Sequence, residues 1–262
     1  MLTTVAEIRA LLRNADEAEL AALERSLAAD SRKGVRDALE AARRRIASQK
    51  AEEERIAALY DFERSYAGGK EEALIVGLDE VGRGSLAGPL AVGAVVLPFQ
   101  PLIAGLNDSK QVKPEMRAQI AETIKQVAIA FAVQYIAPGD IDRDGMSISL
   151  RRAFAGALAQ VEAQGVIPDV VLIDGNPLRL DTREVSVVKG DTKCASIAAA
   201  SILAKASRDA LMCELAPKYP GYAFEENKGY SSERHIQAIR SLGLSEVHRR
   251  SFCSSFMQES LF

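Results

Sequence analysis

The sequence predicts an α/β protein built from layers of helix and sheet, with an all-α extension at its N-terminal end. Two observations predict this fold class. After residue 70, short apolar runs rich in branched residues alternate with stretches of helical periodicity. Before residue 67 there is no proline and a single glycine, and Ala, Glu, Arg and Leu dominate. Strands that alternate with helices are typical of layered α/β folds, and helix formers without breakers favour helix.

The N-terminal extension, residues 1–70, is expected to form two to four helices followed by a linker. Thr4 and Glu7 have the spacing of a capping box at the start of the first helix. Residues 67–70, Ala-Gly-Gly-Lys, break the helical pattern and predict the linker. Three consecutive arginines at 43–45 form a basic group. For that group a solvated helix face is favoured over a nucleic-acid contact.

Residues 71–262 are expected to form the second domain, which holds the sheet. Apolar runs predict strands at 73–78, 90–97, 130–136, 170–173 and 185–188, and periodic segments predict helices at 115–128, 147–163, 196–215 and 232–241. Pro114 stands where the first of these helices would begin, and Pro217 closes the third. From about residue 217 the chain is predicted to be a C-terminal helical region.

Composition and charge narrow the class of protein. A formal net charge of -3 argues against a surface that coats nucleic acid everywhere, but it permits a local basic groove. The three cysteines lack CxxC spacing, and there is no leader pattern or long apolar span. These features predict a cytoplasmic protein without a membrane segment. Because His235 and His248 are the only histidines, oxygen ligands are favoured over a histidine cluster.

Acidic side chains stand at the ends of three apolar strands. Asp79 and Glu80 follow Ile-Val-Gly-Leu, Asp174 follows Val-Val-Leu-Ile, and Asp191 comes soon after Val-Ser-Val-Val. Ligand sites in α/β sheets gather at strand ends, so these side chains are expected to lie together. Taken singly, an acid after a strand is more often a turn former or a helix cap. The consecutive pair is harder to explain in that way.

A cluster of carboxylates needs cations nearby. Three or four carboxylates brought together repel each other unless positive charge neutralises them. Mg²⁺ and Mn²⁺ provide that charge and take oxygen ligands. Two such ions can activate a water and stabilise the leaving oxygen in phosphodiester cleavage. The four acids are therefore a candidate site for two divalent ions.

A glycine-rich segment directly follows the acid pair. Residues 81–89 read Val-Gly-Arg-Gly-Ser-Leu-Ala-Gly-Pro. Glycines on both sides of Arg83 let the backbone approach a ligand, and the guanidinium can bind phosphate or sugar oxygens. A glycine-rich hairpin is the alternative interpretation. A small-molecule phosphate-binding enzyme is disfavoured, because the sequence holds neither a Walker motif nor a dinucleotide-binding glycine motif.

Several segments together resemble the signature of bacterial ribonuclease HII. They are residues 77–84 (Gly-Leu-Asp-Glu-Val-Gly-Arg-Gly), 86–89, 108–110 (Asp-Ser-Lys), 173–176, 189–193 (Lys-Gly-Asp-Thr-Lys), 196–202, 227–230 (Asn-Lys-Gly-Tyr) and 248–249. The resemblance implies an RNase H-like fold, a mixed sheet flanked by helices. It also implies an endonuclease using Mn²⁺ or Mg²⁺ that hydrolyses RNA in RNA–DNA hybrids. Such an enzyme also cuts 5′ of ribonucleotides embedded in duplex DNA, leaving 3′-hydroxyl and 5′-phosphate ends, and so serves ribonucleotide removal in DNA replication and repair.

The resemblance also implies roles for individual residues. Asp79, Glu80, Asp174 and Asp191 match the family's metal-binding carboxylates. Gly82, Arg83 and Gly84 match the segment that senses the 2′-hydroxyl, the group by which proteins distinguish RNA from DNA. Tyr230 matches the tyrosine that packs on the sugar at the RNA–DNA junction. Ser109, Lys110, Lys193 and Ser196 match positions on the phosphate side.

The sequence departs from the family pattern at a few small residues. Ser85 stands where proline is usual, and Cys194 where serine is common. Ser231 and Ser232 replace the usual Gly-Thr after Tyr230. These changes put the backbone shape at the junction-recognition elements in question more than the metal site.

Two other functions and one partner stay open. Another RNase H-like DNA nuclease, such as a resolvase or integrase, would share the acids but would not need the glycine loop and Tyr230. A non-catalytic nucleic-acid-binding module would place four acids beside the phosphates that they repel. A monomer is expected. The tail at 252–262, with three phenylalanines, could contact a sliding clamp, although a helix end packed on the domain is favoured.

Overall fold

The computed structural model describes residues 4–257, and the contacts within the chain group it into two compact units. One unit runs from Met1 to Ala57 and the other from Ala58 to Phe262, so the division falls within helix α3. Among the described residues, no helix is long and apolar enough to cross a membrane. The end of the tail that could contact a clamp, including Leu261 and Phe262, lies outside this range.

The first unit is helical, as the sequence predicts. It contains α1 (Val5–Asn14), α2 (Glu17–Ser26) and the first part of α3 (Lys33–Arg64). The capping box at the start of α1 is confirmed, because Thr4 Oγ1 accepts from the Glu7 amide at 3.2 Å and the Glu7 carboxylate accepts from the Thr4 amide. The apolar faces meet in a small core of buried side chains: Ile8, Leu12, Leu20, Leu27, Val35 and Ala42.

The three arginines at 43–45 are engaged within this unit. Arg43 pairs with Glu24 at 2.5 Å, and Arg44 pairs with Glu40 at 2.6 Å. The Arg45 guanidinium donates to backbone carbonyls at the end of α1. Exposed helix carbonyls commonly accept from basic side chains in this way. These contacts support the interpretation of the basic group as part of the helix surface.

The second unit is built on a five-stranded mixed sheet with the order β3-β2-β1-β4-β5. The strands are β1 (Ile75–Val81), β2 (Leu90–Val96), β3 (Ala130–Ile136), β4 (Val170–Asp174) and β5 (Glu184–Val187). β1, β2 and β3 pair antiparallel, whereas β1, β4 and β5 pair parallel. The mixed sheet expected for an RNase H-like fold is therefore confirmed.

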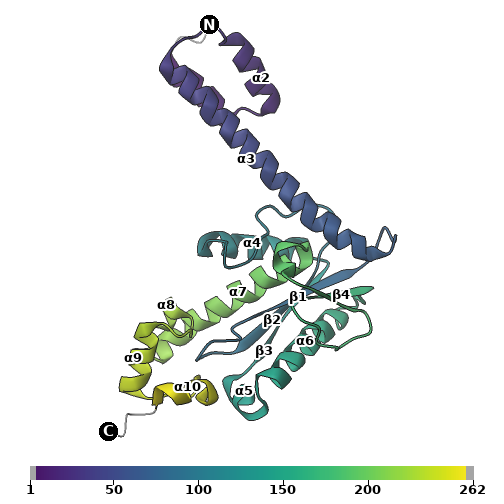
Figure 1. Cartoon of the computed structure of the whole chain (residues 1–262), viewed down its shortest axis with the longest axis vertical. Helices are drawn as coiled ribbons and strands as arrows, with labels where there is room; N and C mark the ends of the chain where they lie inside the picture. Colours follow the sequence, from purple (N-terminus) through teal and green to yellow (C-terminus); the bar gives the residue numbers. More distant parts are fainter. Residues whose placement is uncertain (1–3, 258–262) are drawn as a thin grey trace. The chain divides into compact units, whose positions relative to one another are not determined.

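Helices cover both faces of this sheet, and Figure 1 shows β1, β2 and β3 between α6 and α7. In chain order they are η1 (Ser65–Ala67), α4 (Pro114–Val127), α5 (Pro138–Asp144), α6 (Met146–Glu162), η2 (Gly190–Thr192), α7 (Ala195–Leu215), η3 (Ala216–Lys218), α8 (Phe224–Asn227), α9 (Glu233–Leu242) and α10 (Arg250–Met257). The predicted α4, α6, α7 and α9 are confirmed to within about two residues, as helix ends commonly vary. The short α5, α8 and α10 lacked a clear periodic signal in the sequence.

Two glycines let α7 lie unusually close to the sheet. A Cβ atom at Gly77 of β1 would collide with the backbone of Ser196 and Ile197, and one at Gly93 of β2 would collide with the Ala200 carbonyl. The facing part of α7 is rich in alanine, which keeps the helix surface shallow. Alternate side chains of a strand point to opposite faces. The odd-numbered positions of β1 from 75 to 79 therefore face α7.

The opposite face of the sheet packs on α6. Val76 and Leu78 of β1 share one buried cluster with Ala153, Phe154 and Leu158 of α6. Each fully buried side chain of the leucine or phenylalanine type stabilises the fold by about 1.5–3 kcal/mol. This core and the α7 layer together fix β1 from both sides.

The acid pair lies inside β1 rather than after it, which corrects the strand end expected at residue 78. Antiparallel pairing with β2 continues through Asp79 opposite Gly93 and Glu80 opposite Val92. The strand reaches Val81 because the hairpin partner supplies backbone hydrogen bonds that the sequence pattern does not display. The two carboxylates are consequently held on rigid backbone.

Candidate active site

Three strand ends bring the four predicted carboxylates to one place. Leu78 pairs with Ile173 in the parallel ladder, so Asp79 and Asp174 are the next residues on neighbouring strands and point to the same face. The Gly190 amide donates to Asp174 Oδ1 at 2.6 Å, which ties η2 and its Asp191 to the end of β4. The acids line one pocket of about 440 Å³.

Most of the other residues singled out in the sequence line this same pocket. Including the four acids, the predicted residues that line the pocket are Asp79, Glu80, Gly82, Arg83, Gly84, Ser109, Lys110, Asp174, Asp191 and Tyr230. They come from β1, the β1–β2 connection, the loop before α4, β4, η2 and the loop before α9. Residues spread over about 150 positions of the chain thus converge on one cavity.

Lys193 and Ser196 do not line the pocket. Lys193 is exposed directly after η2. Ser196 is fully buried in the first turn of α7, where its amide donates to Glu63 Oε2 at 2.6 Å. The side chain of Ser196 therefore lies between α7 and β1, against Gly77.

Asp79 is the most deeply buried of the four acids, with 7% of its surface exposed. Burial raises the pKa of Asp79 to about 8, and the charges of Glu80, Asp174 and Asp191 raise it as well. A hydrogen bond with Ser201 opposes this shift. The pocket is therefore a poor environment for the Asp79 carboxylate unless a cation is added.

The pKa values of Glu80 and Asp191 are raised as well. Burial raises the pKa of Glu80, whereas Arg83, whose Nη1 lies 3.4 Å from Glu80 Oε1, lowers it. Burial also raises the pKa of Asp191; Asp174 adds to that shift and Lys110 opposes it. Arg83 and Lys110 do not balance four clustered acids, and the third cation of the pocket, Lys205, is already paired with Asp209. The excess negative charge favours cation binding.

The donor set fits a hard divalent cation. All four acids offer carboxylate oxygens, the ligands of Mg²⁺ and Mn²⁺. Among residues 4–257, no group of three or more His, Cys, Asp or Glu side chains is already arranged to hold a metal ion. Mg²⁺ at phosphate-handling sites is commonly held by one or two carboxylates, with waters and substrate oxygens completing its shell. The pocket suits this open type of site rather than a closed protein cage.

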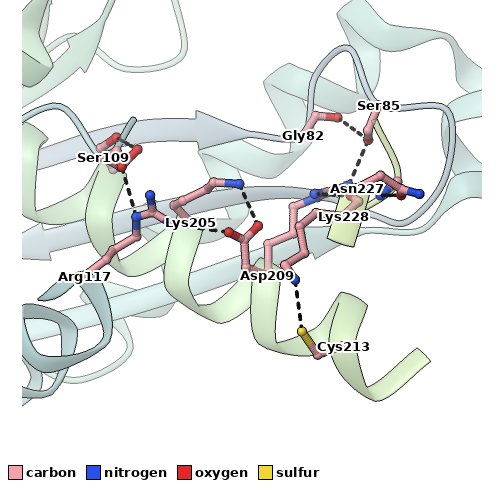
Figure 2. A network of polar contacts seen from close by, with 12 residues as sticks. Gly82, Ser85, Ser109, Arg117, Lys205, Asp209, Cys213, Asn227 and Lys228 are labelled. Atoms are coloured by element: carbon pink, nitrogen blue, oxygen red, sulfur yellow. Dashed lines mark hydrogen bonds and ion pairs between the residues drawn. The ribbon is translucent and has the colours of Figure 1, made fainter. Parts of the chain in front are cut away.

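The glycine loop after the acids is held from within by Ser85. Its hydroxyl donates to the Gly82 carbonyl at 3.0 Å and accepts from Arg208 Nη2 at 2.8 Å (Figure 2). Gly82 has a φ of +82°, and a Cβ there would collide with the Arg208 guanidinium. Gly84, by contrast, has open space around its Cα. The serine at the position where the family usually has proline thus braces the loop with hydrogen bonds.

Two buried arginines, which the sequence reasoning missed as site residues, hold this loop by its carbonyls. Arg208 donates to the carbonyls of Pro89 and Ala87 at 2.8 and 3.0 Å. Arg249 donates to the Arg83 carbonyl at 3.0 Å and twice to Gly88. Burial lowers the pKa of Arg249 to about 9. Charged groups buried against carbonyls make strong, directional contacts, so the loop is rigidly placed.

Tyr230 lies at the edge of the pocket over two cations. Its half-buried ring has the Arg208 guanidinium at 5.3 Å and Lys205 Nζ at 5.4 Å from its centroid. Lys205 in turn pairs with Asp209 at 2.7 Å, and Arg117 approaches the same carboxylate at 3.3 Å (Figure 2). Such cation–π contacts fix the plane of the ring.

Ser201 and Lys205 of α7 also line the pocket and were not predicted. Ser201 Oγ lies 2.9 Å from Ser109 Oγ, and Arg117 Nε donates to the Ser109 carbonyl at 2.9 Å. A signal was available in the sequence. In a helix rich in alanine and isoleucine, polar residues recur at 201, 205 and 209, a spacing that places them on one face.

The fold and the carboxylate-lined pocket at its central strand ends define an RNase H-like nuclease. Residues 76–255 match the family model described as Ribonuclease HII, and residues 4–67 match the one described as Ribonuclease HII N-terminal domain. A ribonuclease HII from Halalkalibacterium halodurans is 40% identical over 253 residues, which cover 95% of this chain and 93% of that protein. The chain therefore belongs to the ribonuclease HII family and is a ribonuclease H, an endonuclease acting on RNA–DNA hybrids.

Solved structures agree with this assignment. The ribonuclease H2 of Pyrococcus horikoshii OT3 is 25% identical, with a TM-score of 0.59 over 71% of this chain and 100% of its own. The RNase HII of Archaeoglobus fulgidus, solved in complex with PCNA, is 25% identical, with a TM-score of 0.58 over 71% of this chain and 98% of its own. Together these likenesses confirm the predicted fold.

Proposed function

We propose that this enzyme also cuts duplex DNA on the 5′ side of an embedded ribonucleotide, leaving 3′-hydroxyl and 5′-phosphate ends, and so serves ribonucleotide removal in DNA replication and repair. One observation carries the proposal. The four carboxylates share a pocket with the glycine loop around Arg83 and with Tyr230. Groups that can bind metal and groups that can read a sugar are thus within reach of one nucleotide.

The carboxylates are the proposed ligands of two divalent ions. Asp79 and Asp174 would bind from the face that they share, Glu80 from the lip of β1, and Asp191 from η2. Bound Mg²⁺ or Mn²⁺ would supply positive charge to the phosphate oxygens and make a water more acidic. Ser201 orients Asp79 through a hydrogen bond, and the Gly190 amide orients Asp174. The pairing of β1 with β2 and β4 keeps the acids in place without reorganisation.

The glycine loop is the proposed reader of the 2′-hydroxyl. Around Gly84 the backbone is open to close approach, whereas Gly82 is fixed by its contact with Arg208. Exposed amides and the Arg83 guanidinium, whose side chain is 63% exposed, can donate to a sugar hydroxyl or a neighbouring phosphate. A deoxyribose would leave these donors without a partner, which is a basis for discrimination.

Tyr230 and the lysines complete the proposed substrate site. The Tyr230 ring, which lines the pocket beside the acids, is proposed to pack on the sugar at the RNA–DNA junction, with Lys205 and Arg208 near it. Lys110 is exposed at the rim beside Ser109 and can bind a phosphate. Lys193, exposed beyond η2, is proposed to meet the strand outside the pocket. The buried Ser196 hydroxyl is left out of this proposal.

A panel of duplexes tests this function. The purified enzyme with Mg²⁺ or Mn²⁺ is given a DNA duplex with one ribonucleotide, a long RNA–DNA hybrid, the same duplex made wholly of DNA, and a four-way DNA junction. We expect cleavage of the first two only, with a single 5′-side cut in the first. Sequencing-gel mobility and phosphatase sensitivity then identify the ends. Cleavage of the all-DNA duplex or of a four-way junction would favour another RNase H-like nuclease instead.

A further inference from the structure

The chain's two histidines form a buried pair beside Tyr230. His235 of α9 is fully buried and His248 is 2% exposed, and their Nε2 atoms lie 3.1 Å apart. At one end, His248 Nδ1 lies 3.0 Å from the Ser245 amide and 2.7 Å from the Ser245 hydroxyl. At the other end, His235 Nδ1 lies 2.8 Å from the Tyr230 carbonyl oxygen. The four groups form one continuous chain of hydrogen bonds.

The hydrogen-bond partners at the two ends of this series fix the tautomer of each ring. A peptide amide can only donate, whereas the Ser245 hydroxyl can donate or accept, so His248 Nδ1 accepts from Ser245 and its proton sits on Nε2. His235 Nε2 then accepts from His248, and its own proton sits on Nδ1. From there it donates to the Tyr230 carbonyl, which can only accept. A proton added to His235 Nε2 would face the His248 N–H, and one added to His248 Nδ1 would face the Ser245 amide N–H, so the arrangement holds only when both rings are neutral.

The surroundings also favour the neutral pair. The ring centroids of Tyr222 and His248 lie 4.8 Å apart, and those of Phe224 and His235 lie 5.4 Å apart. Burial lowers the pKa of both histidines, and for His248 the neighbouring His235 adds to the effect. Hydrogen bonds with the backbone of Tyr230 and of Ser245 oppose these shifts of the two pKa values but do not reverse them. The phenol of Tyr222 has its pKa raised by burial and stays neutral as well.

Hydrogen bonds to its carbonyl oxygen hold the backbone at Tyr230 in place. Lys228 and Gly229 directly before it both have positive φ angles, of 51° and 83°. The Tyr230 carbonyl accepts from the Ser232 amide at 2.8 Å in addition to His235. Both lone pairs of this oxygen are therefore used, and the peptide cannot rotate without breaking two hydrogen bonds.

We propose that His235 and His248 are positioning residues whose neutral hydrogen-bond relay fixes the Tyr230 peptide and thereby aims its ring at the substrate. The relay ties the loop before α9 to the segment just before α10, so the C-terminal helical region sets the orientation of the tyrosine. This inference rests on the proposed role of Tyr230 at the RNA–DNA junction. The relay touches no substrate itself.

Nuclear magnetic resonance of ¹⁵N-histidine tests the relay directly. Because the chain has two histidines, long-range ¹H–¹⁵N spectra contain two ring systems. We expect the Nδ1–H tautomer for one ring, assigned to His235 by its loss in His235→Asn, and the Nε2–H tautomer for the other. The His248 ring should not titrate between pH 8 and 5.5, and the His235 ring should titrate below the ordinary histidine value. Averaged tautomers, or a midpoint near the ordinary histidine value of about 6.5, would overturn the relay.

Kinetics test what the relay does. His235→Leu removes the bond to Tyr230, whereas His235→Asn keeps an N–H donor at a similar position. We expect His235→Leu to lower the ratio of single-ribonucleotide to long-hybrid cleavage by about fivefold, the size of effect typical for one hydrogen bond, and His235→Asn to retain most of it. A purely structural role would lower both activities alike.

The same substitutions in a Tyr230→Ala background separate this inference from the proposed function. If the relay acts through the tyrosine, His235→Leu has no further effect on the ratio once Tyr230 is gone. A persistent effect overturns the inference and leaves the role of Tyr230 intact. An unchanged ratio in Tyr230→Ala alone overturns the role of the tyrosine, and this inference with it. Should His235→Leu not fold, His235→Asn and the ring spectra carry the test.

Discussion

Asp79 and Asp174 are side-by-side residues on two parallel strands, one step beyond the last paired residues, Leu78 and Ile173. Neighbouring strands in a sheet lie roughly 4.7–4.9 Å apart, so backbone hydrogen bonds hold the two carboxylates together whatever their charge. The repulsion between them is built into the sheet. The proposed metal ions would remove that repulsion.

Neutralising one of these acids should separate catalysis from stability. We expect Asp79→Asn to lose more than about a hundredfold in kcat, a loss that even the partners of metal ligands can cause. Without metal the same variant should melt about 2–4 °C higher, because it removes the cost of burying a carboxyl whose pKa the pocket raises to about 8. Calorimetric melts with and without Mn²⁺ measure this. A variant that melts below the parent without metal would contradict the repulsion account.

The close approach of α7 to the sheet should depend on Gly77. We expect Gly77→Ala to destabilise the protein by about 1–3 kcal/mol, the usual cost of overpacking, because the Ser196 and Ile197 backbone has no room for a methyl group. Urea unfolding provides the measurement. The matched control is Gly139→Ala in α5, where nothing lies within 4 Å of the added atom. Equal stabilities for the two variants would disprove the steric argument.

Loss of the Ser85 hydroxyl should loosen the glycine loop. Ser85→Ala removes the links to Gly82 and Arg208 but leaves the carboxylates untouched. We expect cleavage at a single ribonucleotide to fall by about five- to thirtyfold, corresponding to one or two hydrogen bonds. Ser241→Ala, at an exposed position on α9, serves as the control. A parent-like rate for Ser85→Ala would show that the loop does not need this brace.

The histidine pair should make the protein sensitive to mild acid. The folded-state pKa of His248 is lowered to about 4, and that of His235 is also lowered, whereas an unfolded histidine titrates near 6.5. Between these values the unfolded chain binds more protons, so stability falls as pH drops from about 6.5 towards 4 and is unaffected by the pair above that range. Unfolding free energies measured at pH 7 and 5 should therefore differ less in the double variant His235→Asn, His248→Gln. An identical pH dependence in the two proteins would rule this cause out.

The site residues that could be found from the sequence are those marked by a pattern in their immediate sequence neighbours. Asp79, Glu80 and Asp174 stand against apolar runs, and the glycines around Arg83 mark a special turn, so these were found without a structure. Asp191 was found in the same way, soon after the apolar run at 185–188, and the match to family segments added Tyr230 to the same pocket.

Residues whose place depends on tertiary packing were missed. Ser201 and Lys205 reach the pocket only because Gly77 and Gly93 draw α7 onto the sheet. Arg208 and Arg249 meet the glycine loop from more than 100 residues away. Arg208 stands in an ordinary helical segment, and Arg249 belongs to the matched segment 248–249 without an assigned role, since long-range contacts leave no periodic pattern. The end of β1 was misplaced for the same reason, because its last pairs depend on β2.

The most direct test of the account compares one lost carboxylate inside the pocket with one outside it. Asp174→Asn and Asp140→Asn make the same chemical change, but Asp140 lies on α5 beside Arg143, away from the site. Initial rates are measured on a DNA duplex with a single ribonucleotide in the presence of Mg²⁺ or Mn²⁺. We expect the parent and Asp140→Asn to make the 5′-side cut at equal rates, and Asp174→Asn to make none. Cleavage by Asp174→Asn at the parent's rate, or an intact duplex with the parent, would contradict it.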